Sequence, residues 1–156
     1  MKIIGIIPAR MGSSRFPGKP LADLLGMPMI GHVYHRCKMS NILDEVYVAT
    51  CNKEIFDYIE SLGGKAIMTA NTHERASDRA AEALNIIEKD TGQKMDIIVM
   101  LQGDEPMVKP SMIEDAVKPL IDDPTLPVSN LMSEIKTEIE WNDPNEVKVV
   151  SDCNNN

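Results

Sequence analysis

Short, largely apolar runs alternate with segments of helical periodicity along this chain, and the alternation restricts the folds that it can adopt. Runs of this kind are typical of strands buried on both faces of a parallel sheet. The pattern predicts strands at residues 2–7, 45–50, 65–68, 95–101, 128–135 and 147–151, and helices at 28–39, 53–62, 77–88 and 110–121. We therefore expect an α/β fold, with a Rossmann-like, largely parallel sheet flanked by helices.

The composition fits one domain and excludes several classes of partner. The 156 residues are 43% apolar, enough for a single core, so we treat 1–156 as one domain. A net charge of -8 with 4% aromatic residues argues against a nucleic-acid surface, and no apolar run is long enough for a signal peptide or a membrane span. Three scattered cysteines, Cys37, Cys51 and Cys153, fit neither a zinc site nor a disulfide framework. We expect a cytoplasmic protein that binds neither nucleic acid nor membrane.

A cationic loop follows the first predicted strand. Residues 1–22 carry four basic side chains and no acidic one, although the whole chain has 16 basic against 24 acidic groups. Segregation of this kind indicates that the loop binds an anion. A surface turn that is merely basic and contains glycine is the alternative.

The residue types of the loop favour a polyphosphate. Gly12 and Gly18 allow backbone angles closed to other residues and let a ligand approach main-chain N–H groups. Arg10 and Arg15 offer planar forks for two phosphate oxygens, and Lys19 adds a mobile point charge. The glycine spacing matches neither the Walker loop nor the dinucleotide-binding fingerprint. The loop is therefore predicted to be a phosphate clamp of another kind.

Two carboxylates follow the strand predicted at residues 95–101. Asp104 and Glu105 must face solvent or meet a cation there, because an unpaired charge is costly to bury. Mg²⁺ suits this place, since it takes one or two carboxylates together with phosphate oxygens and waters. Neighbours on an extended chain point in opposite directions, so we expect Asp104 alone to bind the metal. An acidic turn that only closes the strand is the alternative.

The chain contains two longer motifs, Ile7-Pro8-Ala9-Arg10-x-x-Ser13-x-Arg15-x-Pro17-Gly18-Lys19-Pro20-Leu21 and Leu101-Gln102-Gly103-Asp104-Glu105-Pro106. Both motifs resemble those of the CMP-Kdo synthetases, the 3-deoxy-manno-octulosonate cytidylyltransferases of Gram-negative bacteria. The resemblance implies a fold of the nucleotide-diphospho-sugar transferase type. It also implies a nucleotidyltransferase that uses CTP and Mg²⁺ to convert a Kdo-like keto-sugar acid into a CMP-sugar and pyrophosphate. Such an enzyme serves lipopolysaccharide or capsule synthesis and is a homodimer at full length.

The resemblance also implies roles for individual residues. Arg10, Arg15, Lys19 and Asp104 would be the catalytic residues, Asp104 as the metal ligand, and Gln102 would contact the sugar. The nucleotide-binding residues would be Ala9, Arg10, Gly12, Ser13, Ser14, Arg15, Lys19, Arg75 and Ser77.

The segment 72–79 departs from the family pattern His-x-Ser-Gly-Thr-(Asp or Glu)-Arg. Aligned on His73 and Arg79, this chain has Arg75-Ala76-Ser77 in place of Ser-Gly-Thr. A bulky cation in place of a small hydroxyl can alter base contacts or the choice of sugar, so another acidic sugar, an 8-amino-Kdo or a nonulosonate, is an alternative substrate. Ser77 also has an alternative role as a helix N-cap.

Family members continue well past the last residue of this sequence. The resemblance assigns the far wall of the sugar site, the main dimer contact and a second metal-binding aspartate to that further part. We therefore expect the 156 residues to lack the C-terminal part of the family protein and to be inactive on their own. A catalytically incomplete nucleotide-binding module is the alternative that follows.

Overall fold

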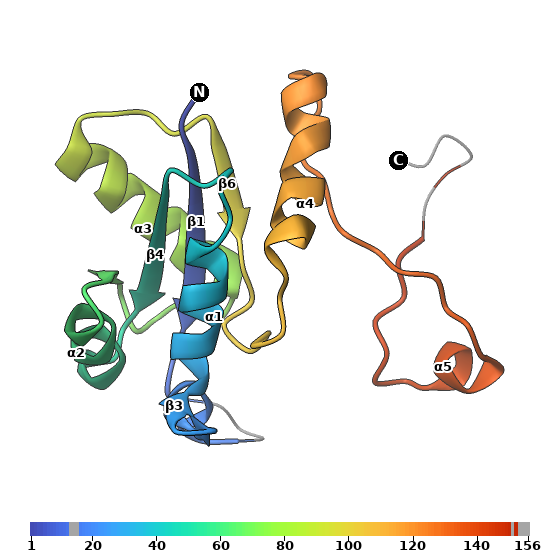
Figure 1. The fold of residues 1–156 in the computed structure, drawn as a ribbon, viewed down its shortest axis with the longest axis horizontal. Helices are drawn as coiled ribbons and strands as arrows, with labels where there is room; N and C mark the ends of the chain where they lie inside the picture. Colours follow the sequence, from blue (N-terminus) through green and yellow to red (C-terminus); the bar gives the residue numbers. More distant parts are fainter. Residues whose placement is uncertain (13–15, 151, 153–156) are drawn as a thin grey trace.

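A parallel sheet forms the centre of the computed structural model, which describes residues 1–12, 16–150 and 152 (Figure 1). Its strands are β1 (Ile3–Ala9), β4 (Glu45–Thr50), β5 (Lys65–Met68) and β6 (Ile97–Met100), in the order β5-β4-β1-β6. All three pairings are parallel, and all seven residues of β1 are buried. The predicted α/β class with a parallel sheet is confirmed.

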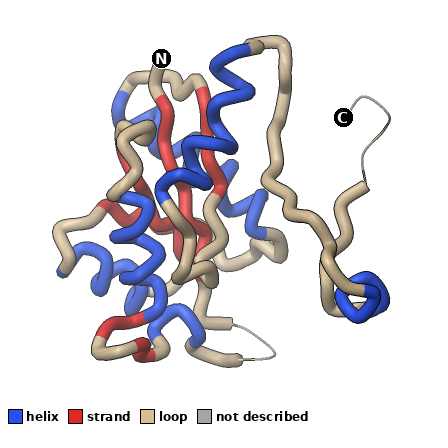
Figure 2. Tube along the Cα trace, turned by 45° about the vertical axis from the view of Figure 1, so that its right-hand side comes forward, coloured by secondary structure: helices blue, strands red, loops and turns tan. Residues whose placement is uncertain are grey.

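Helices cover both faces of this sheet (Figure 2). The helices that pack on it are α1 (Met29–Lys38), α2 (Lys53–Ser61), α3 (Ala76–Thr91) and α4 (Pro110–Asp122), whereas α5 (Glu138–Asn142) lies apart from it (Figure 1). On one face, Ile3 and Ile7 of β1 pack in a cluster with side chains of α1, α2 and α4. On the other face, Ile4 and Ile6 pack in a cluster with α3. Because successive side chains of a strand point to opposite faces, a strand covered on both sides is apolar throughout, as the first apolar run is.

Several predicted bounds agree closely with the structure and others shift. The strands at 45–50 and 65–68 coincide with β4 and β5, and the first strand begins one residue later and ends two residues later than predicted. α3 begins at Ala76 and ends at Thr91, beyond the predicted 77–88, and its C-cap residue is Gly92, whose φ of 66° is left-handed. A two-stranded hairpin, β2 (Asp23–Leu24) with β3 (Met27–Pro28), was not predicted. None of the helices in the described part of the chain combines the length and the apolar character needed to cross a membrane.

The predictions of strands at 128–135 and 147–151 are wrong for the residues that the structure describes, up to 150. These segments belong to an arm, residues 123–150, that leaves the body after α4 and contains α5 (Figure 1). A strand needs a neighbour for its N–H and C=O groups, and the arm pairs with no strand of the described chain. Thr137 and Glu140 form a capping box at the start of α5, a Thr-x-x-Glu signal that was present in the sequence.

Candidate functional site

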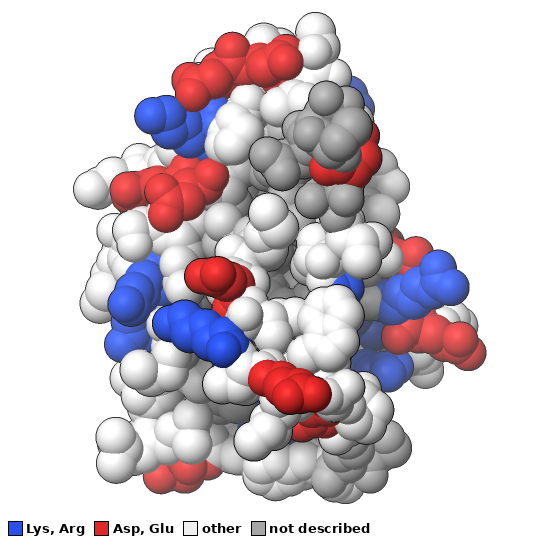
Figure 3. Space-filling view, turned by 90° about the vertical axis from the view of Figure 1, so that its right-hand side faces the viewer, with Lys and Arg blue, Asp and Glu red and all other residues white. Residues whose placement is uncertain are grey.

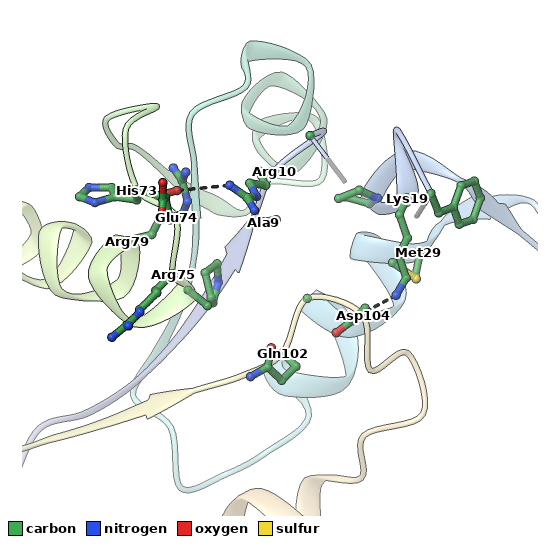
Figure 4. A pocket seen from close by; sticks show the side chains of 16 residues that line it. Ala9, Arg10, Lys19, Met29, His73, Glu74, Arg75, Arg79, Gln102 and Asp104 are labelled. Atoms are coloured by element: carbon green, nitrogen blue, oxygen red, sulfur yellow. Dashed lines mark hydrogen bonds and ion pairs between the residues drawn. The ribbon is translucent and has the colours of Figure 1, made fainter. Parts of the chain in front are cut away.

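A pocket of about 680 Å³ opens at the carboxyl ends of β1 and β6. The chain proceeds from β1 to β4 and β5 on one side and then returns to β6 on the other, so the strand order reverses beside β1. Ligands of open α/β sheets bind at such a switch point. The described lining residues are Pro8, Ala9, Arg10, Gly12, Phe16, Lys19, Pro20, Met29, His73, Glu74, Arg75, Ala76, Arg79, Gln102, Gly103 and Asp104 (Figure 4).

The described part of the cationic loop is held at both ends. Arg10 and Gly12 continue from β1, and Gly18 N–H donates to the carbonyl oxygen of Met11 at 3.0 Å. Gly18 has a φ of 74°, which favours glycine as predicted, and it leads into the short 3-10 helix η1 (Lys19–Leu21). Gly12 is not among the glycines with a positive φ. Among the described residues, a Cβ on Gly12 would meet no atom within 4 Å.

Lys19 and Asp104 meet across the pocket. Lys19 Nζ lies 2.7 Å from a carboxylate oxygen of Asp104, and Figure 4 shows the two side chains pointing toward one another. Their side chains are 35% and 49% exposed, respectively. The turn that carries Asp104 is tightly packed, because a Cβ on Gly103 would lie 2.8 Å from the carbonyl oxygen of Pro8. Gly103 thereby allows the end of β6 to approach β1 and fixes where Asp104 projects.

The opposite wall is the segment between β5 and α3. Arg10 Nη1 donates to the carbonyl oxygen of His73 at 3.3 Å, which ties the loop to this wall. Figure 4 shows the His73 ring directed away from Asp104, and its Nε2 pairs with Glu82 of α3. Glu82 also accepts from the backbone N–H of Ala70 at 2.9 Å. The hydrogen bonds from His73 and from Ala70 lower the pKa of the Glu82 carboxyl.

Arg79 is the most deeply buried cation of the pocket wall, 3% exposed. Its Nη1 donates to Thr69 Oγ1 and, at 3.2 Å, to the carbonyl oxygen of Ala70. Its Nη2 has no hydrogen-bond partner among the described residues. Such a buried donor is costly to leave unpaired. Sequence reasoning used Arg79 only to align the segment, and no local signal marked it as part of the wall.

Most of the predicted site residues come together here. Ala9, Arg10, Gly12, Lys19, Arg75, Gln102 and Asp104 line the pocket. Ser77 lies in the first turn of α3 and is not among the described lining residues, and the N-cap of α3 is Arg75, so the alternative of Ser77 as N-cap is wrong. Ser13, Ser14 and Arg15 lie outside the described residues. The sequence did not single out Phe16 and Met29, because their positions on the wall depend on how the loop and α1 pack.

The residues present fit a metal ion that brings most of its own ligands. No group of three or more His, Cys, Asp or Glu side chains that could hold an ion occurs among the described residues. Asp104 and Glu74 are the carboxylates of the described lining, and only Asp104 follows β6. One carboxylate beside Lys19, with Arg10 in the same lining, suits a divalent cation that keeps several waters and takes further oxygens from a phosphate.

Comparison with known proteins agrees with this architecture. A 3-deoxy-manno-octulosonate cytidylyltransferase of Syntrophus aciditrophicus is 49% identical over 99% of this chain, and one of Trichlorobacter lovleyi is 46% identical over 99%. The solved structure of a CMP:2-keto-3-deoxy-manno-octonic acid synthetase complexed with CTP superposes on 81% of this chain with a TM-score of 0.72 and 45% identity. The chain spans 61% and 59% of the two relatives and 50% of the solved chain.

These comparisons, the sheet order and the pocket at its switch point define the class as an α/β protein of the nucleotidyltransferase type. The family follows from the sequence itself, because the cytidylyltransferase family model matches residues 4–156. The chain belongs to the cytidylyltransferase family.

Proposed function

We propose that the pocket binds CTP with Mg²⁺, and that the whole protein transfers the cytidylyl group to a 3-deoxy-keto-sugar acid such as Kdo. The observation that carries the proposal is the cationic loop at the switch point, with Lys19 facing Asp104 at 2.7 Å. Relatives that match nearly the whole chain are named 3-deoxy-manno-octulosonate cytidylyltransferase, and a similar solved structure is a complex with CTP. Both support the nucleotide and the acceptor sugar.

The reaction needs no covalent intermediate with the protein. The anomeric hydroxyl of the sugar attacks the α-phosphorus of CTP, the bond from that phosphorus to the bridging oxygen breaks, and pyrophosphate leaves. The protein contributes by holding the two reactants in line and by neutralising phosphate charge. When bound, Mg²⁺ would supply further neutralisation of that charge.

Individual residues have separate tasks in this proposal. Arg10, already oriented by its bond to the His73 carbonyl, and Lys19 hold the triphosphate. Asp104 binds the metal, and Gln102 contacts the sugar. The predictions for Ser13, Ser14, Arg15 and Ser77 stand as part of the proposal.

A second candidate acceptor is another acidic sugar, an 8-amino-Kdo or a nonulosonate. The observation that favours it is Arg75, an exposed cation that lines the pocket at the start of α3. A guanidinium at this place can pair with a carboxylate or phosphate of a ligand. Competition among these sugars in a transfer assay would decide between the candidates.

We also propose that residues 1–156 form one nucleotidyltransferase domain of a cytoplasmic, homodimeric protein. The relatives extend beyond the matched part, so we assign nucleotide binding to these residues and sugar transfer to the whole protein.

Calorimetric titration of the 156-residue chain tests the nucleotide assignment. With Mg²⁺ present, CTP is expected to bind more tightly than UTP or ATP. Equal affinity for the three nucleotides would leave a triphosphate site without cytidine specificity, and no binding of any of them would overturn the proposal. Sugar transfer is tested by pyrophosphate release with Kdo.

A further inference from the structure

Asn52 links β4 to the cationic loop by an unusual use of its side chain. It is the N-cap residue of α2, a position where asparagine ordinarily accepts a hydrogen bond from an N–H of the first helical turn. Its side chain accepts none from that turn, which lies wholly within the described residues. Instead, Asn52 Oδ1 accepts from the backbone N–H of Met11 at 2.9 Å, 41 residues earlier in the chain.

Asn52 is itself held in place by its backbone. Its N–H donates to Thr50 Oγ1 at 3.1 Å, and Thr50 is fully buried at the end of β4. Its carbonyl oxygen accepts from Phe56 N–H at 3.1 Å. The side-chain oxygen of Asn52 is therefore presented from a fixed backbone at the edge of the sheet where the pocket lies.

The backbone of Met11 connects Asn52 to both ends of the loop by hydrogen bonds. While its N–H donates to Asn52, its carbonyl oxygen accepts from Gly18 N–H at 3.0 Å. Arg10 and Gly12 flank Met11 in sequence, and Lys19 follows Gly18. Arg10, Gly12 and Lys19 line the pocket. One hydrogen bond from outside the described lining therefore constrains the backbone next to three residues of the wall.

We propose that Asn52 is a positioning residue for the phosphate-binding loop, holding Arg10, Gly12 and Lys19 in a binding-competent arrangement before any ligand arrives. The identity of the ligand rests on the proposed function, but the hydrogen bond to Met11 does not. A loop that visits its binding arrangement only part of the time loses apparent affinity by that fraction.

Two substitutions separate positioning from helix capping. Asn52→Ser keeps a hydroxyl that can cap α2 but is too short to reach Met11, so the melting temperature should be kept while the loop is released. Asn52→Asp retains an acceptor oxygen of the same reach and should keep the Met11 bond. Asn85→Ala, an exposed change in α3, is the matched control.

The test combines amide exchange with titration of two probes, inorganic tripolyphosphate and CTP with Mg²⁺. In Asn52→Ser, exchange of the Met11 amide should accelerate at least about 10-fold, as local opening becomes easier. Affinity for both probes should fall about 10-fold if the competent loop population falls to roughly a tenth. Asn52→Asp should retain slow exchange at Met11, and Asn85→Ala should match the wild type in every measurement.

Three results would overturn the positioning role: unchanged Met11 exchange in Asn52→Ser, faster exchange with undiminished affinity for both probes, or a wild-type chain that binds neither probe. A wild type that binds tripolyphosphate but not CTP, with the expected effects of Asn52→Ser on exchange and on tripolyphosphate affinity, would overturn the proposed nucleotide and leave Asn52 as the positioning residue.

Discussion

Lys19 and Asp104 form an ion pair on the pocket wall. Their side chains are 35% and 49% exposed, and ion pairs of such exposure contribute only about 0–1 kcal/mol to stability. The pair therefore adds little to the free energy of unfolding. A triphosphate carrying Mg²⁺ offers the lysine an anion and the carboxylate a cation, so the pair can open on binding without loss of neutralisation.

Lys19→Ala is expected to weaken binding of CTP with Mg²⁺ by about 1–3 kcal/mol, the scale of a charge-assisted hydrogen bond. The melting temperature without ligand should hardly change, because the pair is weak. Calorimetry and thermal unfolding measure the two quantities. Lys94→Ala is the matched control, since Lys94 is an exposed lysine paired with Glu88 and is not among the described lining residues. Undiminished CTP affinity in Lys19→Ala would contradict the assignment of Lys19 to the phosphate clamp.

Asp104→Asn keeps the size of the side chain and removes its charge. Mg²⁺ should then no longer strengthen CTP binding. Binding of CTP without metal should persist, because Lys19 no longer pairs with a carboxylate at residue 104 and remains available to the triphosphate. The measurement is the CTP dissociation constant with and without Mg²⁺. Glu105→Gln serves as the control, because Glu105 does not belong to the described lining. Mg²⁺ that strengthens CTP binding equally in Asp104→Asn and in the wild type would make Asp104 a turn residue only.

At the scale of helices and strands, the sequence predicts those elements whose formation depends on the local residue pattern. The β4 and β5 runs coincide with their strands. β4 is buried along most of its length, as a strand covered on both faces requires, whereas β5 lies at an edge of the sheet and both of its end residues are exposed. Residues 128–135 have a similar apolar pattern but form no strand, because a strand also requires a neighbouring edge that the local sequence does not specify. The short helix α5 had a detectable signal in Thr137 and Glu140.

The same distinction applies to the site. The places of Arg10, Lys19 and Asp104 on the pocket wall could be predicted because each belongs to a contiguous motif next to a strand. Arg79 and Asn52 could not, since their roles depend on contacts with Thr69 and Met11 that only the folded chain creates. The buried guanidinium of Arg79 and the hydrogen bond from Met11 to the N-cap side chain of Asn52 can be recognised only in the folded structure.

The contact between α3 and the segment before it predicts a dependence of stability on pH. Hydrogen bonds from His73 and the Ala70 N–H lower the pKa of Glu82 in the folded protein. A lowered folded-state pKa contributes stability above the unfolded pKa, about 4.3, and the contribution is lost as pH falls through the folded value. The free energy of unfolding should therefore fall more between pH 6 and pH 3 in the wild type than in Glu82→Gln. Urea unfolding across this range is the measurement, and parallel curves for the two proteins would show that Glu82 contributes no such linkage.

At the scale of the whole molecule, the sheet with its covering helices, here called the body, buries its apolar side chains, whereas the arm exposes many of its own. The body buries its isoleucines and valines on both faces of the sheet. The arm exposes large apolar side chains, among them Val128, Leu131, Met132, Ile139, Trp141, Val147 and Val150. Figure 3 shows uncharged surface between scattered charged groups on the side of the molecule from which the arm projects. Ile98 and Met100 of the edge strand β6 are exposed as well.

Exposed apolar surface on this scale predicts self-association of the 156-residue chain. Ile139 and Trp141, 82% and 64% exposed on α5, are the side chains with which to test it. The sedimentation coefficient of the wild type should rise with protein concentration, and the double change Ile139→Lys with Trp141→Lys should reduce that rise. Glu138→Gln, an exposed change in the same helix, should not. The arm lies outside the described pocket lining, so CTP affinity should be the same in all three proteins. Monomeric sedimentation of the wild type at every concentration would contradict the prediction, as would a rise that the double change leaves intact.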